Sequence, residues 1–292
     1  MKVGIVGVGL LGAAVAQRLL AGGHSVRGYD TRREALAALA PRGLEPAPSA
    51  AEAATGAEAV FTILPSLATV DAAVRGPGGL VETAAPGATI CQMSTISPDL
   101  TRALGEAAAA RGVGFLDTPM SGTSSMVERG DCTIFVGGDP ARAEACRPAF
   151  EAIARRTVHV GAVGEAMLAK LATNLLVALN TAAVAEALVL GAKGGLAPAR
   201  LLEVLKDSAA GSRMLDVRGP LMVEHRFAAQ MKLDLFLKDF GLMLDEGLRV
   251  GAPLPLTSLV RELSKAAVAD GRGGEDLAAI VTAYERLAGM KD

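Results

Sequence analysis

The hydrophobic pattern of the chain changes near residue 164. Before it, short β-branched runs alternate with alanine-rich segments that have apolar residues at helical spacing. The predicted strands are Lys2–Val6, Ser25–Tyr29, Ala59–Leu64, Thr89–Met93, Gly114–Asp117, Thr133–Val136 and Thr157–Val160. The predicted helices between them are Leu11–Ala21, Arg33–Leu39, Ser49–Ala54, Pro98–Arg111 and Ala141–Ala154. This alternation is typical of right-handed βαβ units on a mainly parallel sheet.

After Gly164 the alternation of period two disappears. The remaining pattern predicts helices separated by Gly and Pro: Glu165–Lys193, Pro198–Ser208, Leu235–Val250, Thr257–Asp270 and Leu277–Leu287. We therefore predict an α/β domain over residues 1–163, doubly wound in the manner of a Rossmann fold. An all-α domain over residues 164–292 follows, and a long helix links the two.

The mean hydropathy of +0.37 taken alone suggests a membrane protein. Much of this value comes from alanine, and polar residues interrupt the most apolar stretch, Ala166 to Ala192, at Lys170, Asn174, Asn180 and Glu186. A bilayer span needs about 20 predominantly apolar residues with few charges. This stretch is therefore predicted to be a buried helix, and no membrane partner is expected.

Charge and cysteine usage narrow the class of protein further. A net charge of −2 gives no basic excess that would indicate nucleic acid. The N-terminus enters a strand pattern directly, without the arrangement of a signal peptide, so a cytoplasmic location is expected. Cys91, Cys132 and Cys146 have no metal-ligand spacing and are interpreted as reduced thiols. The three histidines form no cluster in the sequence, and no metal site is predicted.

A glycine-rich turn follows the first predicted strand and opens the first predicted helix. It reads Gly7-Val8-Gly9-Leu10-Leu11-Gly12, which has the GxGxxG spacing. Gly7 allows the tight turn, Gly9 lets a pyrophosphate approach the backbone, and Gly12 allows close packing of helix on sheet. The N-terminus of the helix supplies unpaired N–H groups and a partial positive charge. This position favours dinucleotide binding over an ordinary βα turn.

Asp30 ends the second predicted strand, where a carboxylate can accept hydrogen bonds from both ribose hydroxyls of NAD. The same carboxylate would repel the 2′-phosphate of NADP. Arg32 and Arg33 follow at once, however, and either could pair with that phosphate. The residues favour NAD and leave NADP or dual use open, and a helix N-cap role for Asp30 is compatible with both.

Eight short motifs, in order along the chain, resemble those of the β-hydroxyacid dehydrogenases, a family that includes 3-hydroxyisobutyrate dehydrogenase and tartronate semialdehyde reductase. They are GVGLLG at Gly7–Gly12, Leu64-Pro65, Ser94-Thr95, DTPMSGT at Asp117–Thr123, Gly138-Asp139, the helix segment Lys170–Asn174, Ala210-Gly211-Ser212 and Lys238-Asp239. The resemblance covers essentially the whole chain. It implies an oxidoreductase that transfers hydride between NAD(P) and a small 3-hydroxy acid or semialdehyde carrying a carboxylate or sulfonate.

The resemblance also implies residue roles. Lys170 would be the catalytic residue, and Ser121, Gly122, Thr123, Asn174 and Ser212 would bind the substrate. The cofactor-binding residues would be Gly7, Gly9, Leu10, Leu11, Gly12, Asp30, Thr31, Arg32, Leu64, Pro65, Thr69, Thr95 and Lys238. The family usually has PVSGG where this chain has PMSGT, ending at Thr123, so the identity of the substrate stays open.

The sequence around Lys170 independently favours a role for this residue in acid–base chemistry. Reduction of an aldehyde needs a proton donor at the developing alkoxide, and the reverse reaction needs a base. Lys170 and Asn174 are spaced i, i+4 and project from one face of a very apolar helix, which would lower the pKa of the amine by desolvation. The alternative is a lysine that reaches solvent from a core helix.

Two alternative functions and one expectation about the oligomeric state remain. An imine-reductase-like enzyme would share the two-domain plan, although the lysine argues against it. A non-catalytic dinucleotide-binding regulator would bind the cofactor without turnover. The long helix Glu165–Lys193 has more apolar surface than one small domain needs, so a homodimer or homotetramer is expected.

Overall fold

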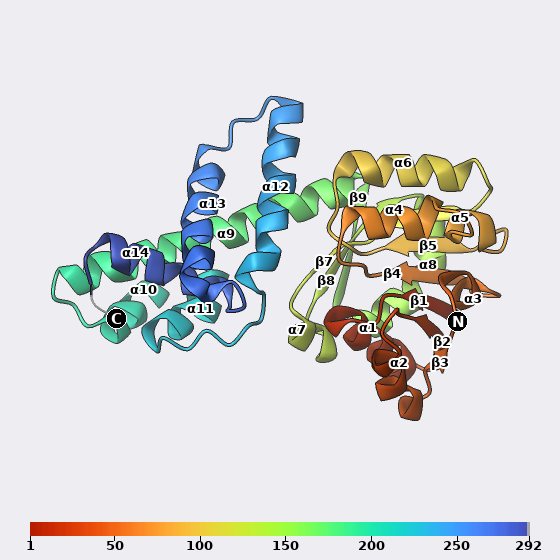
Figure 1. Ribbon diagram of the computed structural model, residues 1–292, viewed down its shortest axis with the longest axis horizontal. Helices are drawn as coiled ribbons and strands as arrows, with labels where there is room; N and C mark the ends of the chain where they lie inside the picture. Colours follow the sequence, from red (N-terminus) through yellow and green to blue (C-terminus); the bar gives the residue numbers. More distant parts are fainter. Residues whose placement is uncertain (291–292) are drawn as a thin grey trace. The chain divides into compact units, whose positions relative to one another are not determined.

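The computed structural model describes residues 1–290 and divides the chain into two compact units (Figure 1). The first runs from Met1 to Lys170, and the second from Leu171 to the end of the described chain. The division falls inside one continuous helix, α9 (Glu165–Lys193). Lys291 and Asp292, the end of the predicted helical domain, lie outside the described residues.

A nine-stranded, mainly parallel sheet forms the centre of the first unit, which confirms the predicted class. Its strands are β1 (Lys2–Val6), β2 (Ser25–Tyr29), β3 (Glu45–Pro46), β4 (Ala59–Thr62), β5 (Thr89–Gln92), β6 (Gly114–Asp117), β7 (Met120–Ser121), β8 (Thr133–Gly138) and β9 (Arg156–Gly161). The order is β3-β2-β1-β4-β5-β6-β8-β7, and β9 pairs with β8. From β3 to β6 every pairing is parallel, whereas β8 runs antiparallel to β6 and β7.

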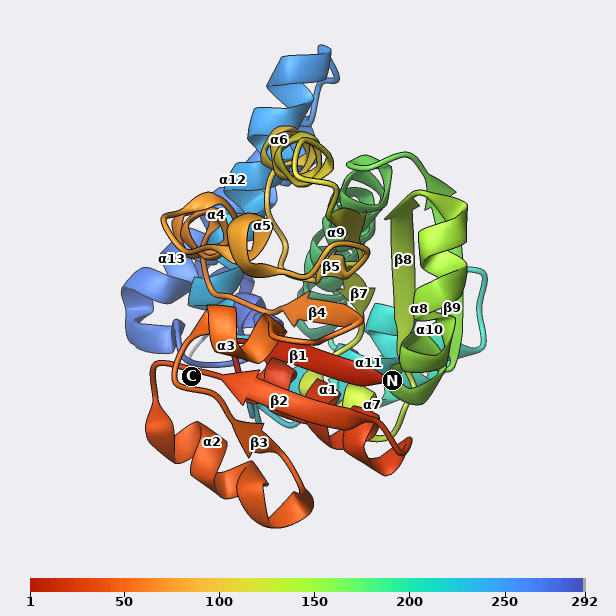
Figure 2. The same ribbon diagram turned by 90° about the vertical axis from the view of Figure 1, so that its right-hand side faces the viewer.

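Helices cover both faces of this sheet (Figure 2). They are α1 (Leu10–Ala21), α2 (Arg33–Leu39), α3 (Ala50–Ala54), α4 (Leu67–Arg75), α5 (Leu80–Thr83), α6 (Pro98–Ala109), α7 (Ser124–Glu128) and α8 (Pro140–Ile153). One core packs β-strand residues such as Phe61 against α1, α2 and α8, and the other packs Val60 against α3 to α6. Successive strand residues therefore enter opposite cores, which is why these strands are apolar throughout.

Several short elements were not predicted from the sequence. They include β3, β7, α4, α5 and α7. The predicted strand Ala59–Leu64 ends two residues early, at Thr62. α4 buries only Val70 and Val74, so its apolar stripe is too sparse for a clear period. Its start is fixed instead by a capping box, in which Ser66 and Thr69 each bond to the other's backbone N–H.

The second unit is helical throughout its described residues apart from an isolated β-bridge between Lys232 and Asp276. After α9 come α10 (Pro198–Lys206), α11 (Arg213–Val223), α12 (Leu233–Val250), α13 (Pro255–Ala267) and α14 (Val281–Leu287), with short π and 3₁₀ segments between the last two. Gly251, at φ +72°, ends α12 in the left-handed conformation that glycine adopts without strain. Helix α11 was not predicted, since Gly219 and Pro220 interrupt its pattern.

Helix α9 is the one helix of the described chain that is long and apolar enough to cross a bilayer. The most apolar 18 residues of this helix have a mean hydropathy of 1.9, and 44% of them are buried within the protein. The core helix of a soluble protein meets the same criterion, and here the buried side chains include Lys170 and Asn174. Length and composition therefore give only weak evidence for a membrane span.

A substitution in the edge-to-face pair Phe61–Phe150 tests the core that packs against α1, α2 and α8. The ring centroids lie 6.1 Å apart at 82°, and both rings are buried between β4 and α8. Because Phe150→Ala leaves a cavity, we expect it to lower the free energy of unfolding by about 3–5 kcal/mol in urea denaturation. The exposed control Leu248→Ala should change it by less than about 0.5 kcal/mol. Equal effects of the two substitutions would contradict this assignment of the core.

Candidate active site

The glycine loop between β1 and α1 has the geometry of a dinucleotide cradle. A Cβ on Gly7, whose φ is +97°, would lie 2.2 Å from the carbonyl oxygen of Ile63, and a Cβ on Gly12 would lie 2.0 Å from that of Gly7. Neither position therefore accepts a side chain. Gly9 is the N-cap of α1 and provides no side-chain acceptor, so the first N–H groups of this 12-residue helix remain available to an anion.

Asp30 lies directly beside this loop. Its Oδ2 accepts a hydrogen bond of 2.7 Å from the N–H of Val8, and its Oδ1 accepts one of 2.8 Å from the N–H of Arg32. The Arg32 Nε lies 3.4 Å from the same Oδ1, and the Arg32 side chain is 58% exposed. The carboxylate is thus held at the end of β2 next to the glycine loop, with the exposed Arg32 guanidinium at its side.

A buried relay of polar groups holds the loop that follows β4. The hydroxyl of Ser94 accepts a 2.8 Å hydrogen bond from the N–H of Leu64. The side chain of Gln92, itself fully buried, bonds both the N–H and the carbonyl of Ser94. Gln92 and Ser94 therefore fix Leu64 and, through it, Pro65. Neither Gln92 nor Ser94 was named as a site residue from the sequence, although the Ser94-Thr95 motif pointed to this loop.

The loop at Ser121–Thr123 combines a constrained backbone with a capping hydroxyl. Gly122 has φ +154°, and a Cβ there would lie 2.8 Å from the Cβ of Cys132, so a larger residue does not fit. The Thr123 hydroxyl accepts from the N–H of Met126 and lies 3.0 Å from Ser125 Oγ, which makes it the N-cap of α7. Thr123 thus caps α7, in addition to the substrate contact that the resemblance implies. Within residues 1–290 no protein partner is found for Ser121 Oγ.

These groups of the first unit meet at one edge of the sheet. Gly7, Asp30, Leu64, Thr95 and Ser121 follow the carboxyl ends of β1, β2, β4, β5 and β6 respectively. Parallel strands bring their carboxyl ends to the same edge, which is where ligands bind in open α/β sheets. Lys170 is only 9% exposed and lies in the second turn of α9, whose Met167 N–H bonds to Asp117 at the end of β6.

In the second unit, Asp239 joins two of the predicted site residues. Its Oδ2 accepts a 2.7 Å hydrogen bond from Asn174 Nδ2, and its Oδ1 lies 3.2 Å from Lys238 Nζ. Asn174 and Asp239 are 5% and 6% exposed. Asp239 was missed as a site residue, although it neighbours Lys238 in the sequence. Ser212 does not take part in these contacts. Its hydroxyl accepts from the N–H of Leu215 and caps α11.

The start of α12, the helix that carries Lys238, is held by a second buried acid. Asp276 Oδ2 accepts from the N–H groups of Gln230 and Met231, and its Oδ1 pairs with Arg218 Nε at 2.9 Å. Asp276 is fully buried and Arg218 nearly so. Removal of either partner would leave an uncompensated charge in the interior, so this ion pair fixes the segment that leads into α12.

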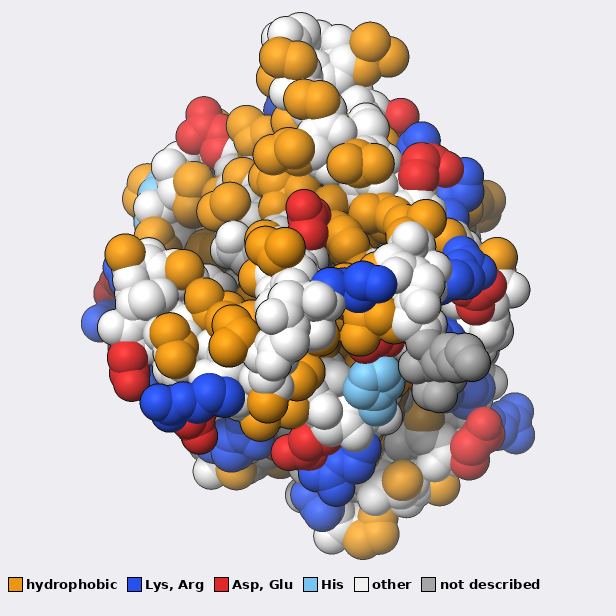
Figure 3. Space-filling view, turned by 90° about the vertical axis from the view of Figure 1, so that its left-hand side faces the viewer, with side chains coloured by type: hydrophobic (Ala, Val, Ile, Leu, Met, Phe, Trp, Pro, Cys, Tyr) orange, Lys and Arg blue, Asp and Glu red, His pale blue; other side chains and the backbone are white. Residues whose placement is uncertain are grey.

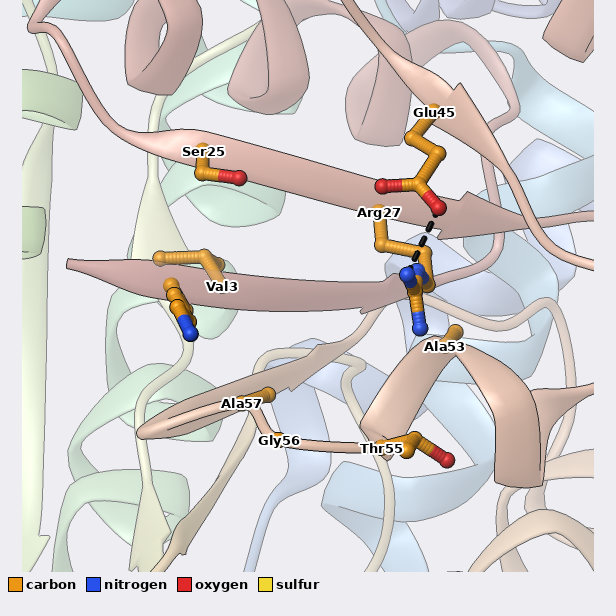
Figure 4. Close-up of a pocket in the computed structure, with 9 residues that line it drawn as sticks. Val3, Ser25, Arg27, Glu45, Ala53, Thr55, Gly56 and Ala57 are labelled. Carbon is orange, nitrogen blue, oxygen red and sulfur yellow. Dashed lines mark hydrogen bonds and ion pairs between the residues drawn. The ribbon is translucent and has the colours of Figure 1, made fainter.

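A cavity of about 220 Å³ lies at the opposite edge of the sheet (Figure 4). Lys2 and Ser25, at the amino ends of β1 and β2, line it together with the ion pair Arg27–Glu45, in which Arg27 Nη2 lies 2.6 Å from Glu45 Oε1. None of the predicted site residues lines this cavity. In the described part of the chain, no three His, Cys, Asp or Glu side chains are grouped to hold a metal ion.

Two family models match almost the entire chain. Residues 2–161 match the NAD binding domain of 6-phosphogluconate dehydrogenase, and residues 164–284 match the NAD-binding domain of NADP-dependent 3-hydroxyisobutyrate dehydrogenase. The chain is 32% identical to 2-(hydroxymethyl)glutarate dehydrogenase of Eubacterium barkeri, over 99% of this chain and 97% of that protein.

Solved structures agree with these matches. The 3-hydroxyisobutyrate dehydrogenase of Mycobacterium tuberculosis, crystallised with L-serine, is 29% identical with a TM-score of 0.89, over 97% of this chain and 98% of that chain. An imine reductase from Myxococcus stipitatus has a TM-score of 0.67 at 18% identity, over 97% of this chain and 99% of that chain. At that identity the likeness to the imine reductase concerns the fold alone.

The relay through Ser94 generates a test of the cofactor side of the site. Ser94→Ala removes the acceptor of the Leu64 N–H, and an unsatisfied buried donor costs about 1–3 kcal/mol. We expect the Kd for NADH, measured by fluorescence titration, to rise at least about fivefold. Ser49→Ala removes a similar hydroxyl at the N-cap of α3 and should leave that Kd unchanged. An unchanged Kd in Ser94→Ala would contradict the role given to the relay.

Proposed function

This chain belongs to the β-hydroxyacid dehydrogenase family, and from that premise we propose that it interconverts a small 3-hydroxy acid and the matching semialdehyde with Lys170 as general acid and base. NAD or NADP is the cofactor. The observation that carries the proposal is a buried lysine, 9% exposed, one turn before a buried asparagine on α9. A buried lysine is rare unless it is paired or has a function, because its ammonium loses hydration.

The bound dinucleotide would supply the hydride, and the chain provides binding, orientation and one proton. The glycine loop and the N-terminus of α1 fit the pyrophosphate, and Asp30 fits the adenosine ribose. In the reducing direction Lys170 donates a proton to the oxygen that becomes the hydroxyl, and in the oxidising direction it accepts that proton. Leu64, Pro65, Thr69 and Thr95 would line the cofactor, with Leu10, Leu11, Thr31 and Arg32 near the phosphates and ribose.

The acid group of the substrate is assigned to the loop at Ser121–Thr123. Because the Thr123 hydroxyl is engaged at α7, the hydroxyl of Ser121 and the backbone N–H groups of Gly122 and Thr123 are the donors left for a carboxylate or sulfonate. Asn174 gives its Nδ2 to Asp239, an orientation that directs its amide oxygen away from that carboxylate and suits it to accept from a substrate hydroxyl. Lys238 is assigned to the cofactor. Ser212 is assigned to the substrate side, where its cap would fix the start of α11.

The surface of the second unit supports the proposed assembly. Hydrophobic side chains gather on one of its faces (Figure 3). Large apolar side chains stay exposed on its helices, including Leu190 at 75%, Val204 at 54%, Leu235 at 61% and Leu259 at 59%. Such surface is typical of an interface between subunits. We therefore propose a homodimer or homotetramer, which light scattering of the purified protein distinguishes from a monomer. The location proposed for it is the cytoplasm.

Lys170→Ala tests the catalytic assignment. General acid–base help contributes about 10²–10⁴ to rate, so we expect kcat with a semialdehyde to fall by that factor while the Kd for NADH stays within about twofold. Lys193→Ala, at the exposed end of the same helix, should retain wild-type kcat. Wild-type turnover by Lys170→Ala would overturn the proposal.

Asp30→Asn tests the cofactor preference on a panel of semialdehydes and 3-hydroxy acids, with carboxylate and sulfonate members. The wild type should prefer NADH, because the Asp30 carboxylate repels a 2′-phosphate. The substitution removes that charge and releases Arg32 to pair with the phosphate. We therefore expect the ratio of kcat/KM for NADPH to that for NADH to rise at least about tenfold, which corresponds to about 1.4 kcal/mol of activation free energy. Preference of the wild type for NADPH would contradict the assignment of Asp30.

A further inference from the structure

Asp117 is a fully buried acid at the end of β6 that the proposed chemistry does not use. Its Oδ2 accepts a 2.8 Å hydrogen bond from the N–H of Met167, in the first turn of α9 and 50 residues further along the chain. Burial raises the pKa of this carboxyl, and the N–H groups of Met167 and Gly164 oppose that rise. The acid therefore joins the sheet to the start of the helix that carries Lys170.

The start of α9 needs such an acceptor from elsewhere in the fold. The residue before its first position, Glu165, is Gly164, which has φ +94° and no side chain to cap the helix. A Ser, Thr, Asp or Asn at that position would normally accept from the N–H of the second or third residue of the helix. Met167 is the third residue, and Asp117 provides the acceptor from β6 instead.

The surroundings of Asp117 leave little freedom in this contact. A Cβ on Gly137 would lie 2.2 Å from Asp117 Oδ1 and 2.6 Å from the carbonyl oxygen of Ala162, in the segment that leads into α9. The glycine of β8 thus leaves room for the carboxylate. Met167 itself is fully buried in the core formed with α3 to α6, so the first turn is held from two sides.

We propose that Asp117 is a positioning residue for Lys170: by accepting from the first turn of α9 it fixes the height and rotation of that turn against β6. Lys170 follows Met167 by three residues and therefore lies on the same side of the helix, one turn on. Each residue of slippage would move the amine by 1.5 Å along the axis and rotate it by about 100°. This inference rests on the proposed function of Lys170.

Asp117→Ala tests this role with two readouts in the full-length protein. The first is amide hydrogen exchange of residues 165–171, which needs no activity. We expect it to be at least about tenfold faster than in the wild type, because the cap on the Met167 N–H is lost. The second is steady-state turnover with NADH and a semialdehyde. A misplacement of about 1 Å can lower rate by about 10²-fold, so we expect kcat to fall 10- to 100-fold while the Kd for NADH stays within about twofold.

Asp139→Ala is the matched control, since Asp139 caps α8 with a 2.8 Å bond to the N–H of Ala141. It should lower thermal stability and leave kcat and the exchange of residues 165–171 unchanged. If kcat falls equally in both variants, or if exchange and kcat in Asp117→Ala match the wild type, the positioning role is overturned. Faster exchange in a protein whose wild type turns over no semialdehyde would keep the anchor and reject the proposed function instead.

Asp117→Asn keeps the proposal testable should Asp117→Ala not fold. The amide preserves the shape and one acceptor, but a neutral acceptor is roughly half as strong as a charged one. We expect exchange at residues 165–171 and kcat to change in the same directions by about two- to tenfold, with the Kd for NADH unchanged. Wild-type values of both would overturn the proposal.

Discussion

Parallel pairing of β1, β2, β4, β5 and β6 is the constraint on which the site depends. It brings the carboxyl ends of five strands to one edge, whatever the length of chain between them. Because helices bury both faces of the sheet, that edge is where the first unit can present polar groups to a ligand. The glycine loop, Asp30 and the Ser121 loop are consequences of this single arrangement.

Buried polar side chains then position the candidate site residues within each unit. Gln92 holds Ser94 and Ser94 holds Leu64, while Asp117 holds the first turn of α9. In the second unit Asp239 holds Asn174, and Asp276 holds the start of α12. Such bonds are strong in a low-dielectric interior and expensive to leave unmade. The residues proposed to contact ligand are therefore oriented by others that do not.

Much of the fold was readable from local patterns. Strands buried on both faces and amphipathic helices have periods that depend on a few neighbouring residues, and the helices from α9 onward followed the loss of the period of two. Helices α4 and α11 were not predicted, because few buried positions in α4 and an internal Gly-Pro pair in α11 blur the period. Of the site, the glycine loop follows from spacing, whereas the role of Lys170 came from the resemblance to a family.

The sequence by itself determined the alternation of strands and helices, the glycine turn that excludes side chains, and the lysine and asparagine one turn apart. Only the tertiary structure decided which groups hold these in place: Ser94 for Leu64 at 30 residues' separation, Asp117 for Met167 at 50, and Asp239 for Asn174 at 65. Periodicity reports interactions within one element. Partners so far apart are selected by strand order and by the need to satisfy every buried donor, and neither leaves a local pattern.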